Sequence, residues 1–131
     1  MIAVVDSSAV IRLFVPDGPI PDGFESFMQE VETGLHTALA PELMSVEVAN
    51  LLQKKKAKEE LSTVEAETLL RLIQRLPIRL IPHSGLVQGA MKLAGVFGLS
   101  VYDATFLELT RQKADHLFTA DQQLAMAAAQ L

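Results

Sequence analysis

The chain has 131 residues, half of them apolar, which supplies one hydrophobic core and leaves little room for a second domain. The absence of cysteine excludes disulfides and thiolate metal sites. The net charge of -5 gives no sign of a basic nucleic-acid surface, although bound divalent cations would offset much of it. No segment has the pattern of a signal peptide or reaches the roughly 18 apolar residues of a membrane span, so we expect a cytoplasmic protein with no membrane contact.

In the first half of the chain, short apolar runs alternate with apolar residues at helical spacing. The predicted elements there are a strand at 2–5, a helix that ends before Pro16, a loop at 16–23, a helix over 24–31, a strand at 35–39 and a helix from Pro41 to about Lys58. Pro41 is assigned to the helix because proline is favoured in the first turn, where its missing N–H leaves no bond unmade.

The second half continues the alternation. Its predicted elements are a helix over 62–76, a strand at 78–81, helices over 85–97 and 100–113, a strand at 116–119 and an alanine-rich helix that begins at Asp121. Ser62 with Glu65 has a capping-box pattern, and Ser100 is expected to cap the helix after it. Strands that alternate with helices imply a parallel sheet covered on both faces. We therefore predict a single α/β domain, residues 1–131, as a three-layer α/β/α sandwich around a short, mainly parallel sheet.

Two aspartates follow predicted strands. Asp6 comes directly after the first strand, and Asp121 lies two residues after the last. Ligands of open parallel sheets bind beyond the carboxyl ends of the strands, so these carboxylates would meet if the two strands are neighbours. An aspartate in this position is also a common helix N-cap, and the sequence leaves both roles open.

Two further acids interrupt apolar helix faces. Glu47 lies one turn from a leucine on either side, so its carboxylate needs a partner. That partner is either a metal ion, with Asn50 in support, or a basic side chain in a structural ion pair. Asp103 also has apolar neighbours one turn away, and it stands at the third position of a capping box that begins at Ser100.

Four acids gathered in one place repel one another unless cations lie between them. Ligand sets made only of oxygen suit hard ions such as Mg²⁺ or Mn²⁺. Zinc is disfavoured because the chain has no cysteine and its histidines, His36, His83 and His116, are scattered. The acids therefore indicate a magnesium or manganese site.

Four blocks around these acids resemble the PIN-domain nucleases, and especially the toxin subunits of VapBC-type toxin–antitoxin pairs. The blocks are VDSS at 5–8, PELMSVEVAN at 41–50, YDATF at 102–106 and TADQQL at 119–124. They follow the family's order and spacing and extend over nearly the whole chain. One Asp-x-Ser is a weak signal, whereas four blocks in order are specific.

The resemblance implies a site with four catalytic, metal-ligating acids and two hydroxyl neighbours: Asp6, Glu47, Asp103 and Asp121, with Ser8 and Thr119 beside them. It also implies that the first and last strands are adjacent. The expected activity is Mg²⁺- or Mn²⁺-dependent endoribonuclease hydrolysis of RNA phosphodiester bonds, with Asp6 as the central ligand of one or two ions. The family further implies a homodimer and a cognate antitoxin protein that masks the site.

Other functions fit the sequence less well. A phosphatase of the haloacid-dehalogenase type needs an acid two residues after the first aspartate, where this chain has Ser8. A response-regulator receiver needs an acidic pair after the first strand, where Asp6 is followed by two serines. The alternative that stays open is a non-catalytic PIN-like module that binds RNA or protein. Such modules usually lose one or more of the acids, and all four are present here.

One lysine cluster is the best candidate for an RNA contact. Its members, at the end of the third predicted helix, are Lys54, Lys55, Lys56 and Lys58. Basic residues are also favoured at helix C-termini for electrostatic reasons, so a solvated helix end is the competing interpretation.

Overall fold

Four parallel strands form one sheet at the centre of the computed structural model, which describes residues 1–131. The strands are β1 (Ile2–Val5), β2 (Thr37–Pro41), β3 (Ile78–Ile81) and β4 (His116–Phe118), in the order β3-β2-β1-β4. In β1, Val4 pairs with Leu39 of β2 on one side and with Leu117 of β4 on the other. The first and last strands are therefore adjacent, as the resemblance implied, and the residues that follow them meet at one edge of the sheet.

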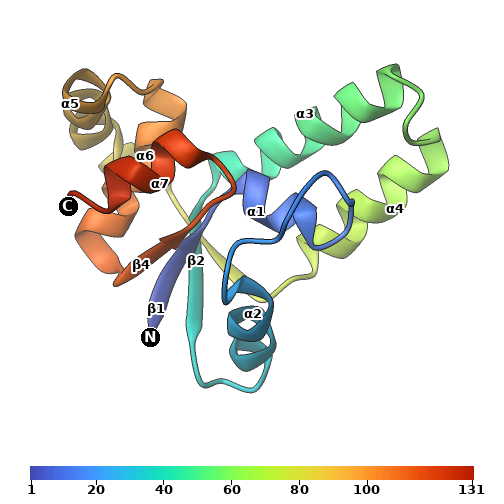
Figure 1. Cartoon of the computed structure of the whole chain (residues 1–131), viewed down its shortest axis with the longest axis horizontal. Helices are drawn as coiled ribbons and strands as arrows, with labels where there is room; N and C mark the ends of the chain where they lie inside the picture. The colour runs from blue at the N-terminus through green and yellow to red at the C-terminus, as the bar shows by residue number, and fades with distance from the viewer.

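One face of the sheet is covered by the C-terminal helices (Figure 1). Helix α6 (Val101–Lys113) contacts β1, β2 and β4, and α7 (Gln122–Ala128) contacts β4. Helix α5 (Val87–Phe97), which follows the short 3-10 turn η1 (His83–Gly85), packs on α6. No single helix has the length and apolar composition to cross a membrane, and α5 with α6 meets those two criteria only as a pair bent by 110°.

The other face is covered by helices from the first half of the chain, so the predicted three-layer architecture is confirmed. Helices α2 (Phe24–Glu32) and α3 (Leu43–Ala57) contact β2, and α1 (Ser7–Arg12) packs against α3. The buried residues of α2 are all apolar and are Phe24, Phe27, Met28 and Val31. These side chains belong to the core, together with the fully buried residues of β1.

Helices α3 and α4 (Thr63–Gln74) form a hairpin that projects away from the sheet (Figure 1). The predicted capping box at its second helix is present. The Oγ atom of Ser62 accepts a hydrogen bond from the N–H of Glu65 at 3.1 Å, and Oε1 of Glu65 accepts one from the N–H of Ser62 at 2.8 Å. Helix α4 packs against α3 and so supports it.

Pro41 is the last residue of β2 and not the first residue of a helix, so the prediction for it was wrong. The register places Pro41 opposite Ile81, and the ladder there uses the N–H of Glu42, which donates to the carbonyl oxygen of Ile81 at 2.9 Å. Because the N–H that proline lacks is not needed at this point, the strand tolerates it. Helix α3 begins at Leu43 instead.

A buried charge lies between α5 and α6. Glu108 is 2% exposed, and its carboxylate accepts hydrogen bonds from Arg111 at 2.6 and 2.8 Å and from Gln112 at 2.7 Å. The Arg111 guanidinium lowers the pKa of Glu108 and keeps it ionised. On α5, a β-carbon added to Gly89 would lie 2.2 Å from Oε2 of Glu108. Gly89 therefore leaves the space that this carboxylate occupies.

Candidate active site

Asp6 is held rigidly at the carboxyl end of β1. It is the N-cap of α1, and its Oδ1 atom accepts hydrogen bonds from the N–H of Ala9 at 2.9 Å and from Oγ of Ser8 at 2.8 Å. Its Oδ2 atom accepts a hydrogen bond from Oγ1 of Thr119. The residue is only 5% exposed. The cap and the site roles that the sequence left open are therefore compatible.

The pairing of β1 with β4 brings the segment of Thr119 and Asp121 beside Asp6. The Oγ atom of Ser8 accepts a hydrogen bond from the N–H of Ala120 at 3.0 Å, and Oγ1 of Thr119 accepts one from the N–H of Asp121 at 3.0 Å. Asp121 in turn caps α7, since its Oδ1 accepts a hydrogen bond from the N–H of Leu124 at 3.0 Å. Two hydroxyl groups thus connect the ends of the two strands.

Glu47 approaches the same place from α3, and its hydrogen-bond partner is a residue that sequence reasoning missed. The Oγ atom of Ser7 donates to Oε1 of Glu47 at 2.8 Å. Asn50, the expected supporting residue, lines the same cavity and makes no hydrogen bond to Glu47. The only available signal for Ser7 was its position next to Asp6, which does not reveal that α1 packs on α3.

Asp103 lies in the first turn of α6. Its backbone N–H donates to Oγ of Ser100 at 3.1 Å, which is one half of the predicted capping box. The Asp103 carboxylate does not return a bond to the N–H of Ser100, so its side chain remains free to face the cavity. Here too, helix capping and a role in the site coexist.

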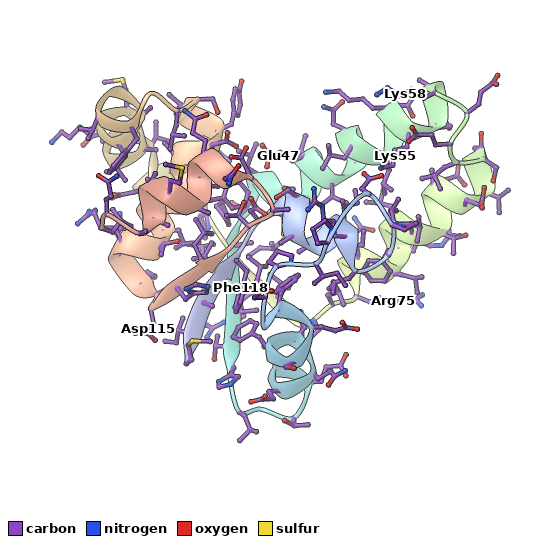
Figure 2. All side chains as sticks on the ribbon, viewed as in Figure 1. Glu47, Lys55, Lys58, Arg75, Asp115 and Phe118 are labelled. Carbon is purple, nitrogen blue, oxygen red and sulfur yellow. The ribbon has the colours of Figure 1, made fainter.

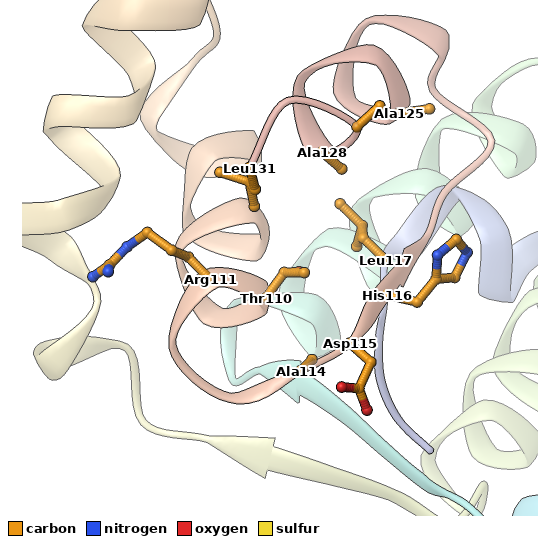
Figure 3. A pocket seen from close by; sticks show the side chains of 10 residues that line it. Thr110, Arg111, Ala114, Asp115, His116, Leu117, Ala125, Ala128 and Leu131 are labelled. Carbon is orange, nitrogen blue, oxygen red and sulfur yellow. The ribbon is translucent and has the colours of Figure 1, made fainter.

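All four acids line one cavity of about 270 Å³. Its other polar lining residues are Ser7, Ser8, Asn50 and Lys54. A larger cavity of about 550 Å³ lies between α6, β4 and α7, where alanines and the exposed residues Arg111, Asp115 and His116 surround it (Figure 3). None of the four acids lines that second cavity, so the predicted site residues are gathered in the smaller, acidic one.

Burial and mutual repulsion raise the pKa of three of these carboxyls. Burial raises the pKa of Asp6, and the charge of Asp103 adds to the increase, whereas the hydrogen bond from Thr119 lowers this pKa and offsets part of it. Burial also raises the pKa of Glu47, with smaller contributions from Asp103 and Asp6. For Asp103, burial and then the charge of Asp121 raise the pKa. Electrostatic repulsion therefore couples all four acids.

The donor set fits a hydrated hard cation. No three Asp, Glu or His side chains lie close enough to enclose a metal ion by themselves. Mg²⁺ keeps several of its waters and needs only one or two carboxylates, so an open acidic cavity suits it. None of the four acids forms an ion pair with lysine, arginine or histidine. The structural ion pair that the sequence left open for Glu47 is therefore excluded.

Comparison with known proteins identifies the family. A family model for the PIN domain matches residues 3–130. The chain belongs to the PIN-domain family. It is also 34% identical over 124 residues to Ribonuclease VapC3 of Pyrobaculum aerophilum, an alignment that covers 93% of this chain and 91% of that protein.

Two solved structures share the fold of this PIN domain. The first is PAE2754 of Pyrobaculum aerophilum, with a TM-score of 0.71 and 21% identity over 95% of this chain and 83% of that one. The second is VapC20 of Mycobacterium tuberculosis, named as a toxin that cleaves the sarcin-ricin loop. It has a TM-score of 0.66 and 15% identity over 95% of this chain and 94% of that one.

The four lysines at the end of α3 in this PIN domain do not form one surface. Lys54 lines the acidic cavity. Lys55 has a side chain that is only 12% exposed and pairs with Asp17 and Glu60, so the RNA contact expected of it is not supported. Lys56 lines a separate cavity between α3 and α4, and Lys58 lies at the far end of α3 from Glu47 (Figure 2).

Proposed function

We propose that this PIN domain is a metal-dependent endoribonuclease that hydrolyses RNA phosphodiester bonds, as the toxin of a VapBC-type pair. The observation that carries the proposal is the convergence of four carboxylates, from four separate parts of the chain, on one cavity in which none of them has an ion-pair partner. The similarity to a protein named as a ribonuclease supports the choice of RNA as substrate.

In this proposal Asp6, Glu47, Asp103 and Asp121 hold hydrated Mg²⁺ or Mn²⁺ in the cavity, with some of the carboxylates binding through the ion's own waters, because no three of them lie close enough to enclose an ion. Bound hard cations of this kind supply an activated water as nucleophile and stabilise the charge that develops on the leaving oxygen. The protein's own contribution is to fix the ligands. Three hydrogen bonds hold Asp6 in one orientation, and Ser7 holds Glu47. Such partners of metal ligands orient them and tune their affinity for the ion.

Replacing Asp6 by Asn tests the activity. The amide keeps the size of the side chain and can still accept the capping bond from Ala9, so the fold should persist while RNA cleavage with Mn²⁺ or Mg²⁺ is lost. Asp22→Asn is the matched control, because Asp22 is exposed in the loop before α2. In a thermal-shift titration, Mn²⁺ should raise the Tm of the wild type and of the control, and should raise that of Asp6→Asn much less.

Undiminished cleavage by Asp6→Asn would contradict the proposed catalytic site. A wild-type protein that binds RNA but neither cleaves it nor responds to metal would favour the non-catalytic PIN-like module. Each of these outcomes can be recognised separately, because cleavage, RNA binding and metal binding are measured on the same purified chain.

We further propose that the protein acts in the cytoplasm as a homodimer and that a cognate antitoxin protein inhibits it by covering the site. Val87 and Met91 are exposed and lie one turn apart on α5, and they support a contact between copies because soluble monomers rarely expose neighbouring large apolar side chains to water. Light scattering on the wild type and on Met91→Glu tests the dimer. Co-purification with the product of an adjacent small gene, with loss of RNA cleavage in the complex, tests the antitoxin.

A further inference from the structure

The face of α3 that lines the acidic cavity ends in a positive charge. This face begins at Glu47, and Asn50 and Lys54 follow it by three and seven residues. That spacing places the three residues on one face of the helix, and all of them line the cavity. Lys54 follows Glu47 by about 10 Å along the helix axis. Long side chains on a helix lean back toward its N-terminus, which brings the Lys54 ammonium group nearer to the acids.

Lys54 is the only lysine on this helix that both reaches the cavity and lacks a partner. It takes part in no ion pair and no side-chain hydrogen bond. By contrast, Asp17 and Glu60 hold Lys55, and the hydrogen bond from its ammonium group to Asp17 raises the pKa of Lys55. Lys56 and Lys58 lie outside the cavity. A free ammonium group beside four carboxylates is therefore available to an anion that enters the cavity.

An RNA strand carries a phosphate at every nucleotide. A strand with one phosphate at the acids must place its neighbouring phosphates beyond the rim of the cavity. On the α3 side that rim carries Lys54, which is a strong point charge for phosphate. We propose that Lys54 binds the phosphate next to the scissile one, so that the strand runs along α3 from Glu47 toward the α3–α4 hairpin. This inference rests on the proposed ribonuclease function and adds the path that the RNA strand takes beyond the acids.

The test compares three variants at one concentration of Mn²⁺. Lys54→Ala removes the charge, Lys54→Arg keeps it, and Lys56→Ala removes the same charge from the opposite face of α3, which is turned toward α4. Cleavage of a single-stranded RNA oligonucleotide gives kcat and KM, and fluorescence anisotropy of the labelled oligonucleotide gives its Kd. We expect Lys54→Ala to raise KM and Kd about tenfold, the effect of losing one charge-assisted contact, with kcat nearly unchanged.

Salt dependence separates a phosphate contact from a structural defect. The slope of log Kd against log salt concentration should fall by about 0.7 in Lys54→Ala, and Lys54→Arg and Lys56→Ala should keep the wild-type slope. Equal KM and Kd in Lys54→Ala and Lys56→Ala, or failure of Lys54→Arg to restore binding, would overturn the assignment. If the wild type binds RNA without cleaving it, the ribonuclease proposal fails, while a weaker Kd and a smaller slope in Lys54→Ala still support the phosphate contact. If the wild type neither binds nor cleaves, both proposals are refuted.

Discussion

Replacing Gly89 by Ala should destabilise the domain, although alanine is the better helix former. The added β-carbon would lie 2.2 Å from Oε2 and 2.3 Å from Cδ of Glu108, so the carboxylate must leave its place. It would then lose three short hydrogen bonds from Arg111 and Gln112, which we expect to cost about 2–4 kcal/mol for a buried charge. Alanine returns about 1 kcal/mol of helix propensity, which leaves a net loss of about 1–3 kcal/mol.

Gly95→Ala is the matched control, because Gly95 lies on the same helix and a β-carbon there would meet nothing within 4 Å. For a domain of this size 1 kcal/mol corresponds to about 4 °C, so calorimetry should show a Tm lowered by about 4–12 °C for Gly89→Ala and raised by about 4 °C for Gly95→Ala. In a Glu108→Ala background the penalty at Gly89 should vanish. Gly89→Ala as stable as Gly95→Ala would show that the carboxylate moves freely and would refute this reasoning.

Three further predictions follow from the site and its supports. In buffer without divalent ions, burial raises the pKa of Asp6 above its ordinary 3.8, so its cost to stability is absent below about pH 3.8 and complete above the raised pKa. The Tm of the wild type should therefore fall relative to that of Asp6→Asn as the pH rises above about 4, and a difference that does not change with pH would contradict the raised pKa. Ser7→Ala removes the one hydrogen bond to Glu47 and should weaken Mn²⁺ binding about tenfold, measured by calorimetric titration; unchanged affinity would mean that Glu47 needs no support. Ser62→Ala should lower the free energy of unfolding in urea by about 1 kcal/mol, and no change would show that the capping box is frayed in solution.

Much of the fold could be predicted because hydrophobic period and chain order constrain it strongly. Strands at 2–5 and 78–81 were predicted at their observed bounds, and their alternation with helices gave the three layers. The order of the strands could not be predicted from periodicity, because periodicity does not say which strands pair. The adjacency of β1 and β4 was predicted from the family resemblance. Pro41 was misassigned because local preference favours it in a helix, while the ladder of β2 with β3 happens to use the N–H of the next residue.

The site was predictable in part for a similar reason. Asp6 and Asp121 follow strands, so the sheet itself brings them together, and Glu47 stands out on an apolar helix face. Ser7 was missed because its role depends on how α1 packs against α3. The lysines were treated as one patch because they are adjacent in sequence. Neighbours on a helix point in different directions, however, and of the four lysines only Lys54 both lies on the face of Glu47 and lines the acidic cavity.

Three helices begin at the acidic cavity, since Asp6 and Asp121 cap α1 and α7 and Asp103 lies in the first turn of α6. The unpaired N–H groups at a helix start carry partial positive charge, which offsets part of the repulsion among the acids through the backbone alone. We therefore expect the chain to complete its folding before any cation arrives. Under the proposed metal dependence, ion binding would then be a separate and reversible event that follows folding.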